Sequence, residues 1–413
     1  MSAADPGSIA IGHSLQGTQF APAAGDVVPR SEGVRVSGKI ARTICIVCGA
    51  GMVSGKEVVS LILARGLRDA GWNPEFIASR WGNGDFVRRL EGDGFRYELL
   101  RLGFISASLR PAPLLMTLDQ IRYWPTLMRG YDRFIKAAAP RAVIHTNWHH
   151  MLLLLPFLDS RRDILWLHDL LPHTRRYAHM LAAISNKVRR VVCVSHAVAR
   201  NVLLLGVPQS RVMVIHSGIP SSDAMPAPDG RPTLRLGIVG QIAPWKGHDD
   251  LLDALALLGP DRARVRLRIF GSGDPDYVAA LKRRVAQLEL NDQVDWCGFV
   301  ENQADIFGSF DVCVMPSRCE ESFGMSALEA NGFGRPVIGS SRGGPAEIIE
   351  NGETGIIVDA QRPEALAHAI ATFVRSPGLA KSMGTAARRR SESSFSLGTF
   401  VGGFENVIEE VMA

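Results

Sequence analysis

The sequence predicts an α/β protein built from two doubly wound, Rossmann-like domains that face across a cleft, and three observations lead to that prediction. Short apolar runs alternate with patterns of helical periodicity along both halves of the chain, which is typical of parallel sheets with βαβ crossovers. The length of 413 residues is enough for two domains of ordinary size. A segment rich in proline and glycine, residues 217–232, separates the two halves.

The strands are predicted from apolar runs bounded by turn-forming residues. In the first half they are residues 43–48, 75–78, 142–146, 164–168, 191–194 and 212–215. In the second half they are residues 234–239, 267–270, 294–297, 312–316, 336–339 and 356–358. Ligands of such sheets bind at the carboxyl ends of the strands, near the point where the strand order reverses.

Composition and periodicity also set the expected domain limits. Residues 1–38 are rich in Gly, Ala, Ser and Pro without periodicity, so we expect a disordered tail. The two domains are predicted over residues 39–217 and 233–395, with residues 218–232 as the linker. Residues 396–413 are expected to form a C-terminal helix, since residues 400–412 are apolar at helical spacing.

The overall composition is that of a globular protein, with 46% hydrophobic and 21% charged residues. The net charge of +5 is compatible with an anionic substrate or an anionic membrane surface. No feature indicates nucleic-acid binding. Six irregularly spaced cysteines indicate no disulfide framework, and Cys45 and Cys48 are expected to be core residues of a strand.

The sequence predicts neither a transmembrane segment nor a signal peptide. No apolar run approaches the roughly 20 residues that span a bilayer. The N-terminus lacks a basic segment followed by an apolar one, so no signal peptide is expected. The expected location is therefore cytoplasmic, with peripheral contact to the inner face of the membrane as an option.

The segment ESFGMSALE, residues 321–329, carries the strongest chemical signal. It follows an apolar strand and opens a helix, where free backbone N–H groups and the positive end of the helix dipole suit a phosphate. Glu321 and Glu329 flank this turn, and carboxylates accept hydrogen bonds from sugar hydroxyls. The alternative is an acid-rich helix start, which the dipole favours without any ligand.

The surroundings favour the ligand-binding interpretation. The segment resembles the E-x7-E signature of the family 4 retaining glycosyltransferases, which have the GT-B fold. The resemblance covers nearly the whole second half and includes five further motifs. They are GQIAPWKG (240–247), IFGSG (269–273), DWCGFV (295–300), DVCVMPS (311–317) and GRPVIGSSRGGPAEII (334–349).

The resemblance implies a role for each motif residue. Glu329 would bind the ribose of a nucleotide-sugar and Glu321 the hydroxyls of the transferred sugar. Lys246 and the backbone of the turn would hold the diphosphate, and the C-terminal helix would cross back to the first domain. The family usually has an arginine at the position of Gln241, so the phosphate contact of this glutamine is in doubt. The remaining implied donor-binding residues are Gly51, Gly55, Gly271, Phe299, Val300, Phe323, Gly324 and Met325.

The first loop, residues 49–57, supports competing hypotheses. It departs from the P-loop pattern at Ala50 and Glu57. It also resembles the dinucleotide fingerprint, but the third glycine, Gly55, comes one residue late. An NAD-dependent oxidoreductase is therefore one rival. In the glycosyltransferase interpretation the loop lies over the donor phosphates and opens a helix over residues 56–70.

His168 ends a predicted strand and is placed at its ligand-binding edge. The resemblance implies that it contacts the donor sugar near the reacting carbon, so His168 and Glu321 are the predicted catalytic residues. The alternative is a structural histidine. His145 ends another strand and could line the same edge.

No metal or cofactor is expected. Asp274-Pro275-Asp276 has the D-x-D spacing of some metal–diphosphate sites, but Asp and Pro are also ordinary helix-start residues. We favour the helix start.

Residues 117–136 are predicted to form one basic amphipathic helix. Arg122, Arg129, Arg133 and Lys136 lie on one face. Such helices can lie on anionic membranes, although a core helix with a solvated basic face fits the same pattern.

These features together predict a metal-independent retaining glycosyltransferase of hexosyltransferase type. It would transfer a sugar from a UDP- or GDP-sugar to a hydroxyl of a saccharide or lipid-linked acceptor, in polysaccharide, glycolipid or glycoconjugate synthesis. The second rival is a catalytically silent GT-B domain that acts as a binding module.

Overall fold

The computed structural model describes residues 42–48, 53–80, 84–103, 111–222, 232–376 and 378–412, with no side chains described for 111–116. The chain forms two compact units. Unit 1 comprises Met1–Cys193, Ala199–Met213 and Gly403–Ala413, and unit 2 comprises Val194–Val198 and Val214–Gly402. The expected linker, residues 218–232, falls partly outside the described residues.

Unit 1 contains a seven-stranded sheet within the described ranges, in the order β3-β2-β1-β4-β5-β6-β7. The strand order reverses between β1 and β4, and the pairs from β3 to β6 are parallel. The strands are β1 (Thr43–Cys48), β2 (Asn73–Ser79), β3 (Arg96–Leu100), β4 (Ala142–His145), β5 (Asp163–Leu167), β6 (Arg190–Cys193) and β7 (Val212–Val214).

The helices that start in unit 1 follow these strands along the chain. Helix α2 begins with a capping box in which Ser54 and Glu57 satisfy each other's backbone N–H groups. The helices are α2 (Gly55–Asp69), α3 (Asp85–Gly92), α4 (Pro111–Arg122), α5 (Trp124–Ala138), α6 (Trp148–Leu154) and α7 (Arg175–Ser185). Helices α8 (His196–Leu204) and α16 (Leu397–Met412) each have residues in both units.

Unit 2 contains a fully parallel sheet, whose strands in the described part of the chain have the order β10-β9-β8-β11-β12-β13. The order reverses between β8 and β11. The strands are β8 (Leu234–Val239), β9 (Val265–Phe270), β10 (Val294–Gly298), β11 (Val312–Met315), β12 (Val337–Ser340) and β13 (Gly355–Val358).

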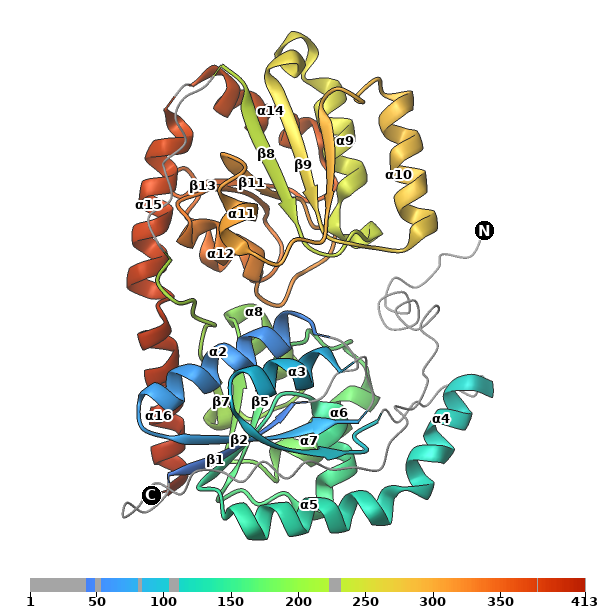
Figure 1. Ribbon diagram of the computed structural model, residues 1–413, viewed down its shortest axis with the longest axis vertical. Helices are drawn as coiled ribbons and strands as arrows, with labels where there is room; N and C mark the ends of the chain where they lie inside the picture. Colours follow the sequence, from blue (N-terminus) through green and yellow to red (C-terminus); the bar gives the residue numbers. More distant parts are fainter. Residues whose placement is uncertain are drawn as a thin grey trace. The chain divides into compact units, whose positions relative to one another are not determined.

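The helices of unit 2 cover this sheet, and α9 and α14 pack against each other over an aliphatic core. Helix α15, drawn in red, lies against α12 (Figure 1). The helices are α9 (His248–Leu257), α10 (Pro275–Gln287), α11 (Gln303–Phe307), α12 (Met325–Gly332), α13 (Pro345–Ile348), α14 (Pro363–Arg375) and α15 (Leu379–Ser394).

All twelve predicted strands are confirmed within one or two residues at each end. Strand β3 was not predicted because its sequence, RYELL, mixes charged and apolar residues. Such a mixture is usual at the edge of a sheet, which is where β3 lies. Cys45 and Cys48 are both fully buried in β1, as expected, and burial raises the pKa of the Cys48 thiol to about 12.

The prediction of one helix over residues 117–136 is wrong. The segment forms α4 and α5, which are separated at Tyr123. Pro125 lies in the first turn of α5, where its missing N–H costs nothing, whereas within one continuous helix it would break the hydrogen-bond ladder. No helix among the described residues is long and apolar enough to cross a membrane.

Helix α16 contributes to the core of unit 1 from the far end of the chain. Phe404 is fully buried, and its ring meets that of Trp166 on β5 edge to face, with the centroids 4.8 Å apart. Trp72 also donates a hydrogen bond from Nε1 to Glu405, over 3.0 Å. The last turns of the chain therefore help to stabilise the first unit.

Replacing Phe404 with alanine should destabilise unit 1 by about 3–5 kcal/mol, because the change leaves a cavity beside Trp166. Urea denaturation followed by tryptophan fluorescence measures this loss. Met412→Ala is the matched control, since Met412 lies on the same helix and is 48% exposed. Equal midpoints for the two variants would contradict the packing role of α16.

Candidate functional site

The predicted donor site lies where β8 and β11 end in unit 2. The loop after β8 carries Lys246 in a short 3-10 turn, and the loop after β11 leads into α12. Parallel strands end at one edge, so these loops meet at the reversal of strand order. The Arg318 N–H donates to the carbonyl of Trp245 over 2.8 Å, which joins the two loops directly.

Two residues predicted from separate motifs meet here as an ion pair. Lys246 Nζ lies 2.7 Å from Glu321 Oε1, and the two side chains are only 24% and 14% exposed. The hydroxyl of Ser317 donates to the same carboxylate oxygen. Sequence reasoning gave Ser317 no role, although it ends one of the quoted motifs. In this state the lysine charge is neutralised by Glu321 and is not free for a phosphate.

The turn that follows Glu321 is shaped by glycines. Gly324 caps α12 with φ +102°, a conformation that side chains disfavour. Gly344 packs so tightly on Phe323 that a Cβ would lie 2.3 Å from its Cα. The side chain of Phe323 is buried, so this residue can offer a ligand only its backbone. Met325 is the first residue of α12.

Glu329 lies one turn into α12 and is partly shielded from solvent. Gln303 Nε2, from α11, donates to Glu329 Oε1 over 2.8 Å. Burial raises the pKa of Glu329 to about 7, and the hydrogen bond from Gln303 only partly opposes that rise. Gln303 was missed by sequence reasoning because it lies 26 residues from Glu329.

The ends of β8, β9 and β10 bring the other predicted donor residues of unit 2 to the same edge. Gly271 has φ +131°, and a Cβ there would lie 1.8 Å from the carbonyl oxygen of Gly240. Glycine is therefore required where these two strand ends approach. Gln241 and Phe299 are exposed, Phe299 at 73%, and Val300 is partly exposed. An exposed aromatic ring at this edge offers a surface on which a base can stack.

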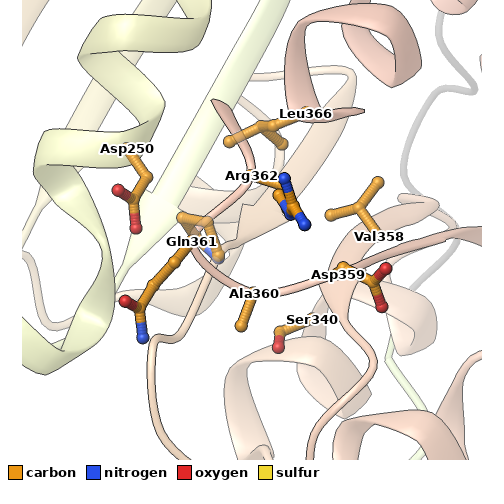
Figure 2. A pocket seen from close by; sticks show the side chains of 9 residues that line it. Asp250, Ser340, Val358, Asp359, Ala360, Gln361, Arg362 and Leu366 are labelled. Carbon is orange, nitrogen blue, oxygen red and sulfur yellow. The ribbon is translucent and has the colours of Figure 1, made fainter. Parts of the chain in front are cut away.

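The hollow in Figure 2 lies beside Pro316, in the loop after β11, and is lined by Asp250 of α9, by the last residues of β12 and β13, and by the segment that follows β13. Asp250, which lines it, accepts two hydrogen bonds from Arg318 of the loop, each 2.7 Å long. This bidentate pair anchors the base of the loop that carries Glu321. The residues lining the hollow are Asp250, Pro316, Ser340, Val358, Asp359, Ala360, Gln361, Arg362 and Leu366.

The other predicted site residues belong to unit 1. Gly55 is the first residue of α2, while Gly51 lies outside the described residues. His168 follows β5, its ring lies 4.3 Å from that of Trp166, and its Nε2 has no partner among the described residues. Burial lowers the pKa of His168 well below its usual value, and the charge of Lys56 adds to the effect. His168 is therefore neutral at physiological pH.

His145 does not line a ligand-binding edge, which corrects the expectation. Its ring is fully buried, and Nε2 lies 2.6 Å from Asp163 Oδ1. Two other histidines, His149 and His150, lie near Lys56 instead. Burial lowers the pKa of His149 to about 3, with a smaller contribution from Lys56. Sequence reasoning assigned these two residues no role.

The D-x-D triplet is confirmed as a helix start. Asp274 is the N-cap of α10, and its Oδ1 accepts hydrogen bonds from the N–H groups of Asp276 and Tyr277 over 3.0 and 3.1 Å.

Both halves of the chain match family models. Residues 230–390 match the model described as glycosyl transferases group 1. Residues 53–223 match the model described as glycosyltransferase family 4. This chain belongs to the family 4 glycosyltransferases.

The glycosyltransferase is similar to several curated proteins. It is 36% identical to a D-inositol 3-phosphate glycosyltransferase of Streptomyces scabiei over 206 residues, 44% of this chain and 45% of that protein. It is 33% identical to the lipopolysaccharide core biosynthesis mannosyltransferase LpcC of Rhizobium leguminosarum bv. viciae over 165 residues, 39% of this chain and 47% of that protein. The matched region spans a little under half the length of these relatives.

Solved structures show that the fold is GT-B. Anabaena HepE, in complex with UDP and glucose, superposes with a TM-score of 0.72 at 20% identity, over 89% of this chain and 100% of that one. A glycosyltransferase of Rickettsia africae gives a TM-score of 0.72 at 22% identity, over 91% and 99%. The match of residues 53–223 includes Gly55, so the oxidoreductase interpretation of the first loop has no support.

The raised pKa of Glu329 has a consequence for stability. An unfolded chain ionises this group near 4.5, whereas the folded protein keeps its proton up to about 7. Between these values the unfolded state binds fewer protons, so the stability of unit 2 should fall as pH rises through this window. The loss should reach about 3 kcal/mol above pH 7.

Glu329→Gln should remove this loss, because the amide is neutral and its oxygen still accepts from Gln303. Urea midpoints at pH 5 and pH 8 measure the difference. Glu353→Gln, at an exposed position of the same unit, is the control. Parallel pH profiles for Glu329→Gln and the wild type would contradict the shifted pKa.

Proposed function

We propose that this protein transfers a sugar from a nucleotide diphosphate sugar to an acceptor hydroxyl, with retention of anomeric configuration and without a metal ion. The observation that carries the proposal is the meeting of Lys246, Glu321 and Ser317 at the strand-order reversal of unit 2. Lys246 would supply the cation for the diphosphate and Glu321 the carboxylate for the sugar, and the two side chains are in direct hydrogen-bond contact. The UDP and glucose bound to Anabaena HepE support a UDP-sugar donor.

Donor binding must exchange the partners of the Lys246–Glu321 pair. The diphosphate draws the ammonium group away from Glu321, since a phosphate carries more charge than a carboxylate. The released carboxylate then accepts hydrogen bonds from the sugar hydroxyls, while Ser317 keeps it in place. Because the two events depend on each other, the intact donor is favoured over its separate parts.

The nucleoside end is bound by other residues of unit 2. Glu329 accepts from the ribose hydroxyls, and Gln303 fixes the direction of its carboxylate. Phe299, exposed after β10, provides a stacking surface for the base. The backbone around Gly324 and Met325 faces the phosphates at the start of α12.

The chemistry depends on stabilising the leaving diphosphate. Lys246 and the start of α12 supply positive potential where negative charge develops, which takes the place of a metal ion. Retention follows from attack on the donor face that the diphosphate leaves, with the diphosphate accepting the proton of the acceptor hydroxyl. His168, neutral and buried, acts as a hydrogen-bond partner of the donor sugar.

The proposed acceptor is a saccharide or a lipid-linked saccharide, in the synthesis of a polysaccharide or a glycolipid. The relatives named as a lipopolysaccharide core mannosyltransferase and a D-inositol 3-phosphate glycosyltransferase support a polyhydroxylated acceptor.

A ligand panel tests the proposed function. Thermal-shift measurements with UDP, GDP, ADP and NAD should show stabilisation by one of the nucleoside diphosphates and none by NAD. Release of that diphosphate from its sugar donor, with the anomeric configuration of the product read by NMR, tests transfer and retention. Diphosphate binding without any turnover over a broad acceptor panel would favour the silent binding module.

The two signature carboxylates should have separable effects. Glu329→Ala should weaken binding of the free nucleoside diphosphate by ~1.5–3 kcal/mol, the range for a hydrogen bond to a charged group. Glu321→Ala should retain or increase that affinity, because it frees Lys246, while lowering transfer. His168→Ala should resemble Glu321→Ala.

Calorimetric affinity for the diphosphate, measured beside turnover in the three variants, checks these roles. If Glu321→Ala remained folded but lost diphosphate affinity as severely as Glu329→Ala, the assigned roles would be wrong.

Activity should survive chelation. Transfer is expected to continue in EDTA, because Lys246 and the start of α12 provide the positive potential at the leaving group. The measurement is the initial rate before and after dialysis against EDTA. A complete loss that Mg²⁺ or Mn²⁺ restores would show that a metal assists the chemistry.

Peripheral membrane binding is proposed for the region where α4 meets α5. Leu118, Ile121 and Trp124 are 53%, 56% and 40% exposed, which is unusual for apolar side chains so close together. Arg122 is the last residue of α4, and Arg129 lies in the second turn of α5. Arg133 and Lys136 pair with Glu98 and Asp132, so their charge is partly neutralised.

The combined change Ile121→Ser and Arg122→Gln should reduce binding to anionic vesicles, and raised salt should do the same for the wild type. Sedimentation with vesicles of stated anionic content measures both effects. Arg133→Gln is the control and should have a smaller effect, because its positive charge already has a carboxylate partner. Equal binding to neutral and anionic vesicles would exclude the electrostatic contribution.

A further inference from the structure

Three potential metal ligands converge in unit 2 outside the donor loops. They are His196 at the start of α8, His216 after β7 and Glu347 on α13, and one ligand atom of each lies within 4.8 Å of the others. We propose that these three side chains form a binding site for a divalent transition metal of the zinc class. The residues are too far apart in sequence for spacing to have indicated it.

Glu347 is held in place by the backbone. Its Oε2 and Oε1 accept hydrogen bonds from the N–H groups of His196 and Ala197, each 2.8 Å long. These two hydrogen bonds fix the direction of the carboxylate, as hydrogen bonds to metal ligands commonly do.

His216 is held by packing. Its ring stacks on that of Phe323, at 5.7 Å and 24°, and meets Phe395 edge to face at 5.4 Å. The Nε2 atom lies 2.9 Å from Glu347 Oε2, which already brings two ligand atoms to the separation found across one metal ion. Ligands 2.0–2.1 Å from a tetrahedral zinc lie about 3.3 Å apart.

His196 completes the set from an exposed position. Its ring centroid lies 5.5 Å from that of His216, so the two rings are already close to each other in the metal-free protein. The proposal requires a rotation of this exposed side chain to bring its ring nitrogen within bonding distance of the ion. Two imidazoles and one carboxylate suit Zn²⁺ or Co²⁺, with a fourth position left for water, whereas Mg²⁺ and Ca²⁺ prefer oxygen ligands.

The alternative for these contacts is a simple ion pair between His216 and Glu347 that stabilises unit 2. The two roles can be separated because the ion pair joins His216 to Glu347, whereas the side chain of His196 contacts this pair only by packing against the His216 ring. His196→Ala preserves the backbone N–H that Glu347 accepts, and it leaves the His216–Glu347 pair intact. His216→Ala removes both the pair and the site.

Isothermal titration of Zn²⁺ into the full-length, tag-free protein tests the site. The wild type should bind one equivalent, and His196→Ala should weaken that affinity at least tenfold without changing the urea midpoint of the metal-free protein. His368→Ala, which removes an exposed histidine elsewhere in unit 2, should bind zinc as the wild type does. Mg²⁺ at the same concentration should not compete.

Cobalt provides a second measurement. Co²⁺ added to the wild type should give the intense visible absorption of a tetrahedral site, and His196→Ala and His216→Ala should both lose it. Zinc binding or cobalt absorption that was the same in His196→Ala as in the wild type would overturn the proposal. The proposal would also be overturned if the wild type and His196→Ala bound the same number of zinc equivalents with the same affinity.

Discussion

The ion pair between Lys246 and Glu321 is the interaction on which the proposed donor site depends. It joins the loop after β8 to the loop after β11, at the point where the strand order of unit 2 reverses. Neighbouring hydrogen bonds strengthen the contact between the two loops, because Arg318 binds Asp250 through its side chain and Trp245 through its backbone N–H. Each group of the pair is only partly exposed and already has a partner, which a ligand must replace before that group can bind it.

The proposed function gives this pair two arrangements, one without and one with a donor. Without a donor, Lys246 and Glu321 satisfy each other's charge. A ligand that offers both a diphosphate and hydroxyl donors can replace both halves of the interaction. A ligand with only one of them leaves the other half unpaired, at an energetic cost. Under the proposed function, preference for an intact nucleotide-sugar would follow from this ion pair.

The proposed metal site is connected to this loop by packing. Phe323, between the two signature carboxylates, is buried and stacks on His216, which in turn pairs with Glu347. Gly344 packs against Phe323, and its N–H donates to the carbonyl of Glu321. The segment after β12 therefore packs against the loop that carries Glu321 and Phe323 and helps to hold its backbone in place. The close backbone approach at Gly344 explains why the motif needs glycine there.

The sequence by itself determined the fold class and all but one of the described strands, and it supplied the residues of the proposed donor site. Continuous apolar runs indicate strands that are buried on both faces, whereas the edge strand β3 mixes charged and apolar residues and contains no such run. The end of α4 before Tyr123 could have been predicted from Pro125, because proline is favoured in the first turn of a helix and disfavoured in its interior. The sequence analysis nevertheless predicted one continuous helix. Only the tertiary structure decided which side chains meet. Three of these contacts join residues from different parts of the chain: Lys246 with Glu321, Gln303 with Glu329, and His196 with His216 and Glu347. The burial of His145 likewise depends on neighbouring strands. Their separations along the chain are set by crossover connections, so no local pattern records them, and the pKa of Glu329 is raised by surroundings that exist only after folding.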